Sequence, residues 1–370
     1  MKRYVQITVG LLLAVLLMAL LLRGVKWGEL YASFWKMHMG WLLLAQVPIW
    51  LSFFFRILRW TYIVRAVKPA TFRSMFSSTQ LAFLVNFTIG MRLGELVRPL
   101  VLSRLSKLSF SQSLAVNALD RVTDLIGLLV VMLVTAFAFR PTATVVLPAG
   151  TFGIEAPFEI HPSVIVGTGR MSAIVLIGVI VLFVLLYVNQ RLVVACTQAV
   201  LSTVSKRFAA WVCAMIEQFA QGLHVFRSAG DMTKSISWSL ATWACFLIVY
   251  ACMFEAFAMD WPWYAPFVVQ VLVAFAVSAP GVPGMVGQFH IPIVVGMLMS
   301  IPGVSLADSI LLAMVVHASN MLPILVLGMY CMYREGFSFF ELSTDSVEIE
   351  EELLRAEEER AESEQRPGDA

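Results

Sequence analysis

Charged side chains gather in stretches of this sequence that are otherwise apolar enough to lie in a membrane. The set holds four arginines and three carboxylates: Arg56, Arg92, Glu95, Arg98, Asp120, Arg121 and Asp124. A charge at the centre of a bilayer costs about 2.5–3.5 kcal/mol on insertion scales, so such residues usually face a cavity or a partner. Arginine binds phosphate well through its planar fork of donors and its permanent charge. The set therefore predicts a polar pocket in which arginines bind a phosphate and carboxylates balance their charge.

The spacing of these residues places several of them on shared helix faces. Asp120 and Asp124 are four residues apart, with Asn117 about one turn below, and Arg56 lies three residues from Arg59. Residues three or four apart on a helix are neighbours on its surface. We expect Arg59 itself to extend toward the membrane interface and to take no part in the pocket.

A purely structural interpretation of the same charges stays open. Ion pairs such as Glu95–Arg121 and Asp124–Arg98 could fix the fold without binding anything. The sequence alone does not decide between this network and a binding pocket. The coincidence of charges with a broken helix favours the pocket.

Two apolar segments are interrupted by glycine and proline at corresponding positions. Gly94-Glu95 in the first aligns with Gly287-Gln288 in the second, which also brings Pro99 onto Pro292. Proline removes a backbone donor and glycine tolerates unusual dihedral angles, so each segment should form two short helices joined by a turn. Such interruptions in corresponding halves of a chain are typical of transporter binding sites.

Lysine and arginine placement predicts the topology, because cytoplasmic loops carry an excess of these residues. Full spans are expected at 4–22, 40–64, 115–139, 171–189, 236–257 and 307–333. Both chain ends are then cytoplasmic. Segment 75–104 enters and leaves from the cytoplasm, and segment 265–300 enters and leaves from outside. The expected fold is an all-α polytopic membrane protein with six transmembrane helices and two oppositely oriented re-entrant hairpins, an inverted repeat. Two ordinary kinked spans are the alternative.

Composition supports this class and divides the chain into two parts. Hydrophobic residues make up 59% of the sequence and charged residues only 14%, so residues 1–335 form a membrane domain. Within it we expect an external loop at 140–170 with a small β-hairpin, and a cytoplasmic amphipathic helical segment at 191–230. The remainder, 336–370, is an acidic cytoplasmic tail, expected to be disordered or a solvated helix.

The second interrupted segment is much less charged than the first. It offers Gln288 and His290, while His317 and Asn320 lie three residues apart on the following span. His317 and Asn320 could line the outer half of the same cavity as the arginines. A histidine in a span is more often bonded to a nearby carbonyl group, and that interpretation also stays open.

The sequence gives no motif for catalysis or for a bound cofactor. It has no HExxH, GxSxG, P-loop or dinucleotide-binding glycine pattern, and its five cysteines include no CxxC. We expect no enzyme activity, no cofactor, no metal and no nucleic-acid partner. Membrane lipids with phosphate head groups are the expected partners.

The interrupted segments resemble a known family. Asn86-x-x-x-Gly90-x-Arg92-x-Gly94-Glu95-x-x-Arg98, followed by Ala118-Leu-Asp120-Arg121-x-x-Asp124, is similar to the first signature of the lysylphosphatidylglycerol synthase transmembrane family. Pro280-Gly281-Val-Pro283-Gly284-Met-Val-Gly287 resembles its second. The resemblance covers most of residues 1–335 and implies a lipid-translocating domain, often a homodimer, like the flippase part of bifunctional synthases.

Two departures limit what the resemblance implies. The family commonly has Glu after the second turn, where this chain has Gln288, so a symmetric two-carboxylate or proton-coupled scheme is in doubt. After the last span only the acidic tail follows, in place of the aminoacyl-transferase domain of the bifunctional synthases, so lipid aminoacylation is not expected. We expect a flippase-like transporter of an anionic phospholipid or polyprenyl-phosphate-type lipid in the inner membrane. The alternatives are a non-transporting scaffold for an envelope-synthesis enzyme and an intramembrane enzyme acting on a lipid phosphate.

Overall fold

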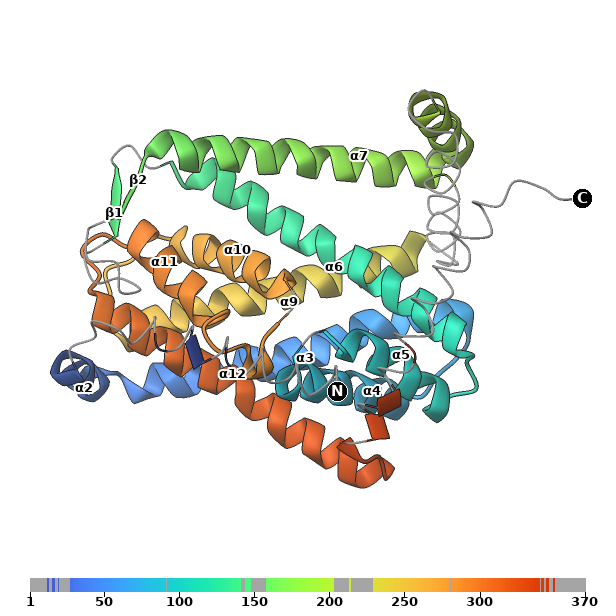
Figure 1. Cartoon of the computed structure of the whole chain (residues 1–370), viewed down its shortest axis with the longest axis horizontal. Coiled ribbons are helices and arrows are strands. Elements are labelled where there is room, and N and C mark those ends of the chain that lie inside the picture. Colours follow the sequence, from blue (N-terminus) through green and yellow to red (C-terminus); the bar gives the residue numbers. More distant parts are fainter. Residues whose placement is uncertain are drawn as a thin grey trace, which may run out of the picture.

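The computed structural model is helical almost throughout (Figure 1). It describes residues 27–90, 92–140, 144–147, 158–202, 229–279 and 281–339, with a few positions outside these ranges, among them 341, 342, 344 and 345. Its elements are α2 (Trp27–Lys36), α3 (Met39–Val67), α4 (Phe72–Thr88), α5 (Gly94–Leu105), α6 (Phe110–Ala138), β1 (Val145–Leu147), β2 (Phe158–Ile160), α7 (Pro162–Leu201), α9 (Ala229–Ala256), α10 (Ala265–Ser278), η2 (Pro283–Met285), α11 (His290–Ser300) and α12 (Leu306–Glu335).

Long apolar helices make this a multi-pass membrane protein. Residues 39–65, 110–138, 230–256 and 306–335 are each long and apolar enough to cross a bilayer, and α7 has 40 residues. These five helices match five of the six predicted spans, while span 4–22 lies almost wholly outside the described residues. Stretch 283–300 also passes on length and hydropathy, yet it contains a turn. Its continuous helix, α11, has 11 residues and is only about 16 Å long at 1.5 Å per residue, too short to cross.

The two interrupted segments are helical hairpins. Hairpin one is α4 packed on α5, and hairpin two is α10 packed on α11. Figure 1 shows hairpin two toward the end of the molecule that carries β1 and β2, and hairpin one toward the other end. Both predicted breaks are confirmed as turns between separate helices. Re-entry of each hairpin into a bilayer from opposite sides stays a prediction.

The turns of the two hairpins touch each other. A Cβ atom placed on Gly90 would lie 2.5 Å from the carbonyl oxygen of Gly281, and the side chain of Arg92 donates to the carbonyl of Ser278 at 2.8 Å. Gly90 has φ +79°, a conformation that glycine adopts at no steric cost. We name these contacts the inter-hairpin contact. It brings residues almost 190 positions apart together.

Separate apolar clusters surround the two hairpins. One joins hairpin two to the adjoining halves of α3, α9 and α12, with Ile49, Phe53 and Met253 buried in it. Another joins α3 from Ile57 onward to α6 and to the ends of α4 and α5. Helix α3 therefore passes from one cluster to the other between Phe53 and Ile57. The charged residues lie around this boundary.

Smaller elements agree with the sequence in outline. Strands β1 and β2 form the expected antiparallel β-hairpin. Helix α7 has non-helical dihedral angles at Asn189, whose side chain accepts a hydrogen bond from the N–H of Leu192, so the helix restarts where segment 191–230 was predicted to begin. Most of the rest of that segment lies outside the described residues.

The start of the acidic tail is packed against hairpin one. Leu342 is completely buried in a cluster with residues of α4, α5 and α12. Arg104 at the end of α5 forms ion pairs with Glu341 at 2.9 Å and with Asp345 at 2.6 Å. The described tail positions are helical, as one of the two expectations had it, but they are not fully solvated, because Leu342 is buried against the membrane domain.

Candidate functional site

The turn of hairpin one is built by residues of the first signature. Asn86, near the end of α4, accepts a hydrogen bond from the N–H of Gly94 at 2.7 Å and so caps the start of α5. Gly94 has no room for a side chain, since a Cβ there would lie 2.6 Å from Cγ of Asn86. Arg92 has φ +59°, which is unusual for a residue with a side chain. The turn therefore fixes where α5 begins relative to α4, and with it the positions of Glu95 and Arg98.

Arg59 is the centre of a buried ion-pair network. It donates to both carboxylate oxygens of Asp120, at 2.8 and 3.1 Å, and also pairs with Asp124. Only 3% of its side chain is exposed, because α9 covers it with Ser239. The prediction that Arg59 extends to the interface is wrong. Arg59 thus contacts both carboxylates on the shared face of α6.

Arg98 belongs to the same buried network. Its guanidinium donates to Asp120 at 2.6 Å and to the side-chain oxygen of Asn117 at 3.2 Å, and it stacks 3.6 Å from the ring centre of Trp60. The suggested Asp124–Arg98 pair is wrong, since Asp120 takes Arg98. We call Arg59, Arg98 and Asp120 the buried layer. These side chains are almost sealed from solvent.

A second group of charges is partly open. The suggested Glu95–Arg121 pair is confirmed, with contacts of 2.9 and 2.8 Å. Exposed side-chain fractions are 24% for Asp124, 27% for Glu95, 40% for Arg121 and 45% for Arg92. We call these four residues the open layer. Arg121 and Asp124 lie in the long apolar helix α6, and Arg92 and Glu95 lie at the turn of hairpin one beside it. Partly exposed charges at such positions are what a polar cavity requires.

The two layers are joined through α5 and α6. Asn117 accepts from Arg98 and donates to the backbone oxygen of Glu95 at 3.2 Å. Asp124 is shared in the same way, because it pairs with Arg59 and accepts from the indole N–H of Trp243 at 3.2 Å. The hydrogen bonds of the buried layer therefore fix the positions of the residues of the open layer.

Arg56 differs from the other arginines of the cluster. Among the described residues it makes no hydrogen bond and no ion pair, although Asp124 and Arg121 lie within its electrostatic range. Its guanidinium lies 5.2 Å from the ring centre of Phe83 and 5.0 Å from that of Phe246. The side chain is half-buried. It sits at the boundary between the two apolar clusters.

Hairpin two uses its polar residues to shape its own turn. Gln288 donates from its amide to the carbonyl oxygens of Ala276 and Ala279, at 2.6 and 3.2 Å. His290 accepts from the N–H of Gly287, and His317 donates to the carbonyl of Gly284 at 2.8 Å.

The imidazole rings of His290 on α11 and His317 on α12 are close neighbours, with centres 4.5 Å apart. Asn320 donates to the carbonyl of Val316 in its own helix. Gln288, His317 and Asn320 were predicted to bind substrate. Their hydrogen bonds among the described residues are with backbone carbonyl groups, and substrate binding stays a prediction for them.

Comparison with known proteins decides the family. The model of the lysylphosphatidylglycerol synthase TM region matches residues 7–328. The chain belongs to this family. No curated protein and no solved structure gave a match.

The family match spans both hairpins and every residue of the two layers. In this member of the family, the residues of the first signature have distinct structural tasks. Asn86 and Gly94 build the turn, Gly90 and Arg92 contact hairpin two, and Glu95 faces Arg121.

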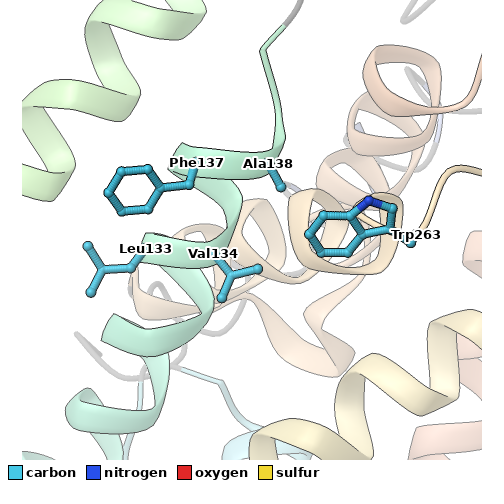
Figure 2. A pocket seen from close by; sticks show the side chains of 5 residues that line it. All are labelled: Leu133, Val134, Phe137, Ala138 and Trp263. Carbon is cyan, nitrogen blue, oxygen red and sulfur yellow. The ribbon is translucent and has the colours of Figure 1, made fainter.

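A separate apolar pocket of about 360 Å³ lies at the far end of α6. Leu133, Val134, Phe137 and Ala138 line it with Trp263, and Figure 2 shows Val134 and Ala138 on the side of α6 that faces the indole ring. The first residue that lines this pocket, Leu133, is nine residues beyond Asp124, about 14 Å along α6. With no charged residue in its lining, this pocket suits hydrocarbon and not a head group.

Several members of the site were missed from the sequence. Trp60 stacks on Arg98, and α9 contributes Ser239 and Trp243. One signal was present, because Ser235, Ser239 and Thr242 place small polar residues along α9 at helical spacing, which favours close packing of membrane helices. The partner helix could not be named from that pattern.

Proposed function

We propose that this protein moves a lipid with a phosphate head group between the leaflets of a bacterial inner membrane, with both chain ends cytoplasmic. The observation that carries the proposal is the open layer beside the inter-hairpin contact. It places partly exposed arginines and carboxylates where two broken helices meet, which is the arrangement of many transporter sites.

The chemistry of the open layer suits reversible binding of an anion. Arg121 is held by Glu95 in the empty protein, so its charge is balanced without a ligand. An arriving phosphate would compete with Glu95 for the guanidinium donors. Such an exchange keeps Arg121 paired in both states, and the released Glu95 carboxylate still lies 3.9 Å from the guanidinium of Arg92.

The inter-hairpin contact provides an element that could change between two states. Arg92 holds the end of α10 through the carbonyl of Ser278. Rocking of one hairpin against the other would break and remake this contact. The open layer would then be accessible first from one side of the membrane and then from the other, which is the mechanism called alternating access.

We propose transport without lipid chemistry, and hence no enzyme activity. The family model supports a role with membrane lipids and leaves the lipid open. A homodimer stays a prediction, which the mass of the purified protein in detergent would test.

The test uses purified protein in vesicles that contain a head-group-labelled phospholipid. Transbilayer movement should be faster than in protein-free vesicles and in vesicles with an unrelated multi-pass protein. Mass spectrometry of the lipids before and after should show no new product. Equal rates in all three vesicle types would refute transport, and a hydrolysed lipid would point to an enzyme.

A further inference from the structure

Arg56 is an unmatched cation inside the membrane domain. Together with Arg56, the buried layer and the open layer contain five arginines and three carboxylates. The carboxylates are already engaged by Arg59, Arg98 and Arg121. Two arginines remain. Arg92 donates to the carbonyl of Ser278 and forms a longer ion pair with Glu95 at 3.9 Å, whereas Arg56 has neither a hydrogen bond nor an ion pair among the described residues.

Arg56 has no ion-pair partner among the described residues even though a carboxylate lies near it. Asp124 lies within electrostatic range of Arg56, yet its carboxylate is held by Arg59 and by the indole of Trp243. Trp243 is fixed in turn, since a Cβ on Gly127 of α6 would lie 2.6 Å from its indole nitrogen. Close packing of α6 and α9 thus keeps Asp124 occupied.

The surroundings of Arg56 suit a group that carries its own negative charge. Phe83 and Phe246 face the guanidinium, and all three side chains are half-buried, so part of each is accessible. Aromatic faces attract a cation without hydrogen-bonding it, which leaves its N–H donors free. Arg56 also lies 11 residues from the end of α3, about 16 Å along the helix from that end.

We propose that Arg56 is the anchor for a single phosphate group of a membrane lipid, held between Phe83 and Phe246. This rests on the proposed lipid transport and names the class of head group. One guanidinium balances the single negative charge of a phosphate diester. A phosphate monoester carries about 1.5–2 negative charges at pH 7 and a diphosphate more, so both bring excess charge. Arg59 and Arg98 are positioning residues, because both guanidinium groups are already paired with the buried carboxylate of Asp120.

The test measures lipid binding by native mass spectrometry of the full-length protein in detergent. The probes are phosphatidylglycerol, diacylglycerol, a polyprenyl diphosphate and inorganic phosphate. Arg56→Gln should weaken phosphatidylglycerol binding at least tenfold, and Arg56→Lys should restore part of it. Arg65→Gln, an exposed arginine on the same helix, is the matched control and should bind like wild type.

Each other outcome has a definite meaning. Unchanged binding by Arg56→Gln overturns the anchor, and tighter binding of the diphosphate overturns the single-phosphate class. Competition by inorganic phosphate at the same concentration overturns the lipid source. If Arg56→Gln does not fold, Phe246→Leu should weaken the same binding, and unchanged binding there also overturns the site. Arg56-dependent binding in a protein that never moves lipid would retain the anchor and refute the proposed transport.

Discussion

Arg59 and Asp120 form a two-point ion pair that joins α3 to α6 across 61 residues of sequence. Both side chains are nearly inaccessible, and Arg98 from α5 also pairs with Asp120, so the charges of the two arginines are balanced only when Asp124 is counted with Asp120. Three helices are thus tied together at one level of the membrane domain. The residues that bind most tightly to each other are therefore the ones least available to a ligand.

The buried layer should matter for stability more than any exposed charge. Asp120→Asn leaves Arg59 and Arg98 facing a neutral amide, and breaking a buried pair in this way typically costs about 3–5 kcal/mol. We predict a clear fall in the melting temperature measured in detergent. Glu159→Gln, an exposed glutamate on β2, is the control and should melt like wild type. A melting temperature for Asp120→Asn equal to the control would contradict the structural role.

The inter-hairpin contact should not tolerate a side chain at Gly90. Alanine there meets the carbonyl of Gly281 and must adopt φ +79°, a left-handed conformation that costs an L-residue about 1–2 kcal/mol. We predict that Gly90→Ala lowers thermal stability and slows lipid movement. Gly40→Ala, where nothing lies within 4 Å of the new Cβ, is the matched control. Equal behaviour of the two variants would show that the turns do not pack as described.

The amide of Gln288 should not be replaceable by a carboxylate at neutral pH. Both of its partners are carbonyl oxygens, which need a donor, and a carboxylate has none. We predict that Gln288→Glu destabilises the protein by about 1–3 kcal/mol at pH 8. Protonation supplies an O–H donor, so part of that stability should return as the pH falls toward 5. Thermal unfolding of the variant and of wild type between pH 8 and pH 5 measures how their stability difference changes with pH. If the variant lost further stability relative to wild type on acidification, the predicted direction would be wrong.

The start of the tail should detach when its buried leucine is truncated. Leu342→Ala removes a completely buried side chain, a change that usually costs about 2–5 kcal/mol in a core. We predict faster proteolysis near residue 342 than in wild type. Leu322→Ala, exposed on α12, should leave the rate unchanged.

Removal of the tail tests the scaffold alternative. If removal of residues 341–370 abolished function in cells but left vesicle transport intact, the scaffold alternative would gain support.

The sequence predicted the architecture well because its signals were local. Glycine and proline mark the turn of each hairpin directly, and long apolar runs mark α3, α6, α9 and α12. The end of span 171–189 and the β-hairpin of loop 140–170 were likewise predicted, from breaks between apolar runs.

The pairing of charges was harder to predict, since it depends on how helices rotate against one another. Glu95–Arg121 was anticipated, while Arg59 was assigned to the interface and Arg98 to the wrong aspartate. The depth of Arg59 is set by α9, which covers it with Ser239 and was not a predicted neighbour. Hydropathy reports how apolar a helix is and says little about which helix buries each face.

The most direct test of the central claim is the transport rate of the Glu95→Gln/Arg121→Gln double variant, normalised to folded protein. This change removes one carboxylate and one guanidinium from the open layer and keeps the net charge. We predict at least a tenfold loss in the rate of head-group-labelled phospholipid movement, with little change in melting temperature because both residues are partly exposed. A rate equal to wild type, or one that falls only in proportion to lost folded protein, would show that the open layer does not bind the transported lipid.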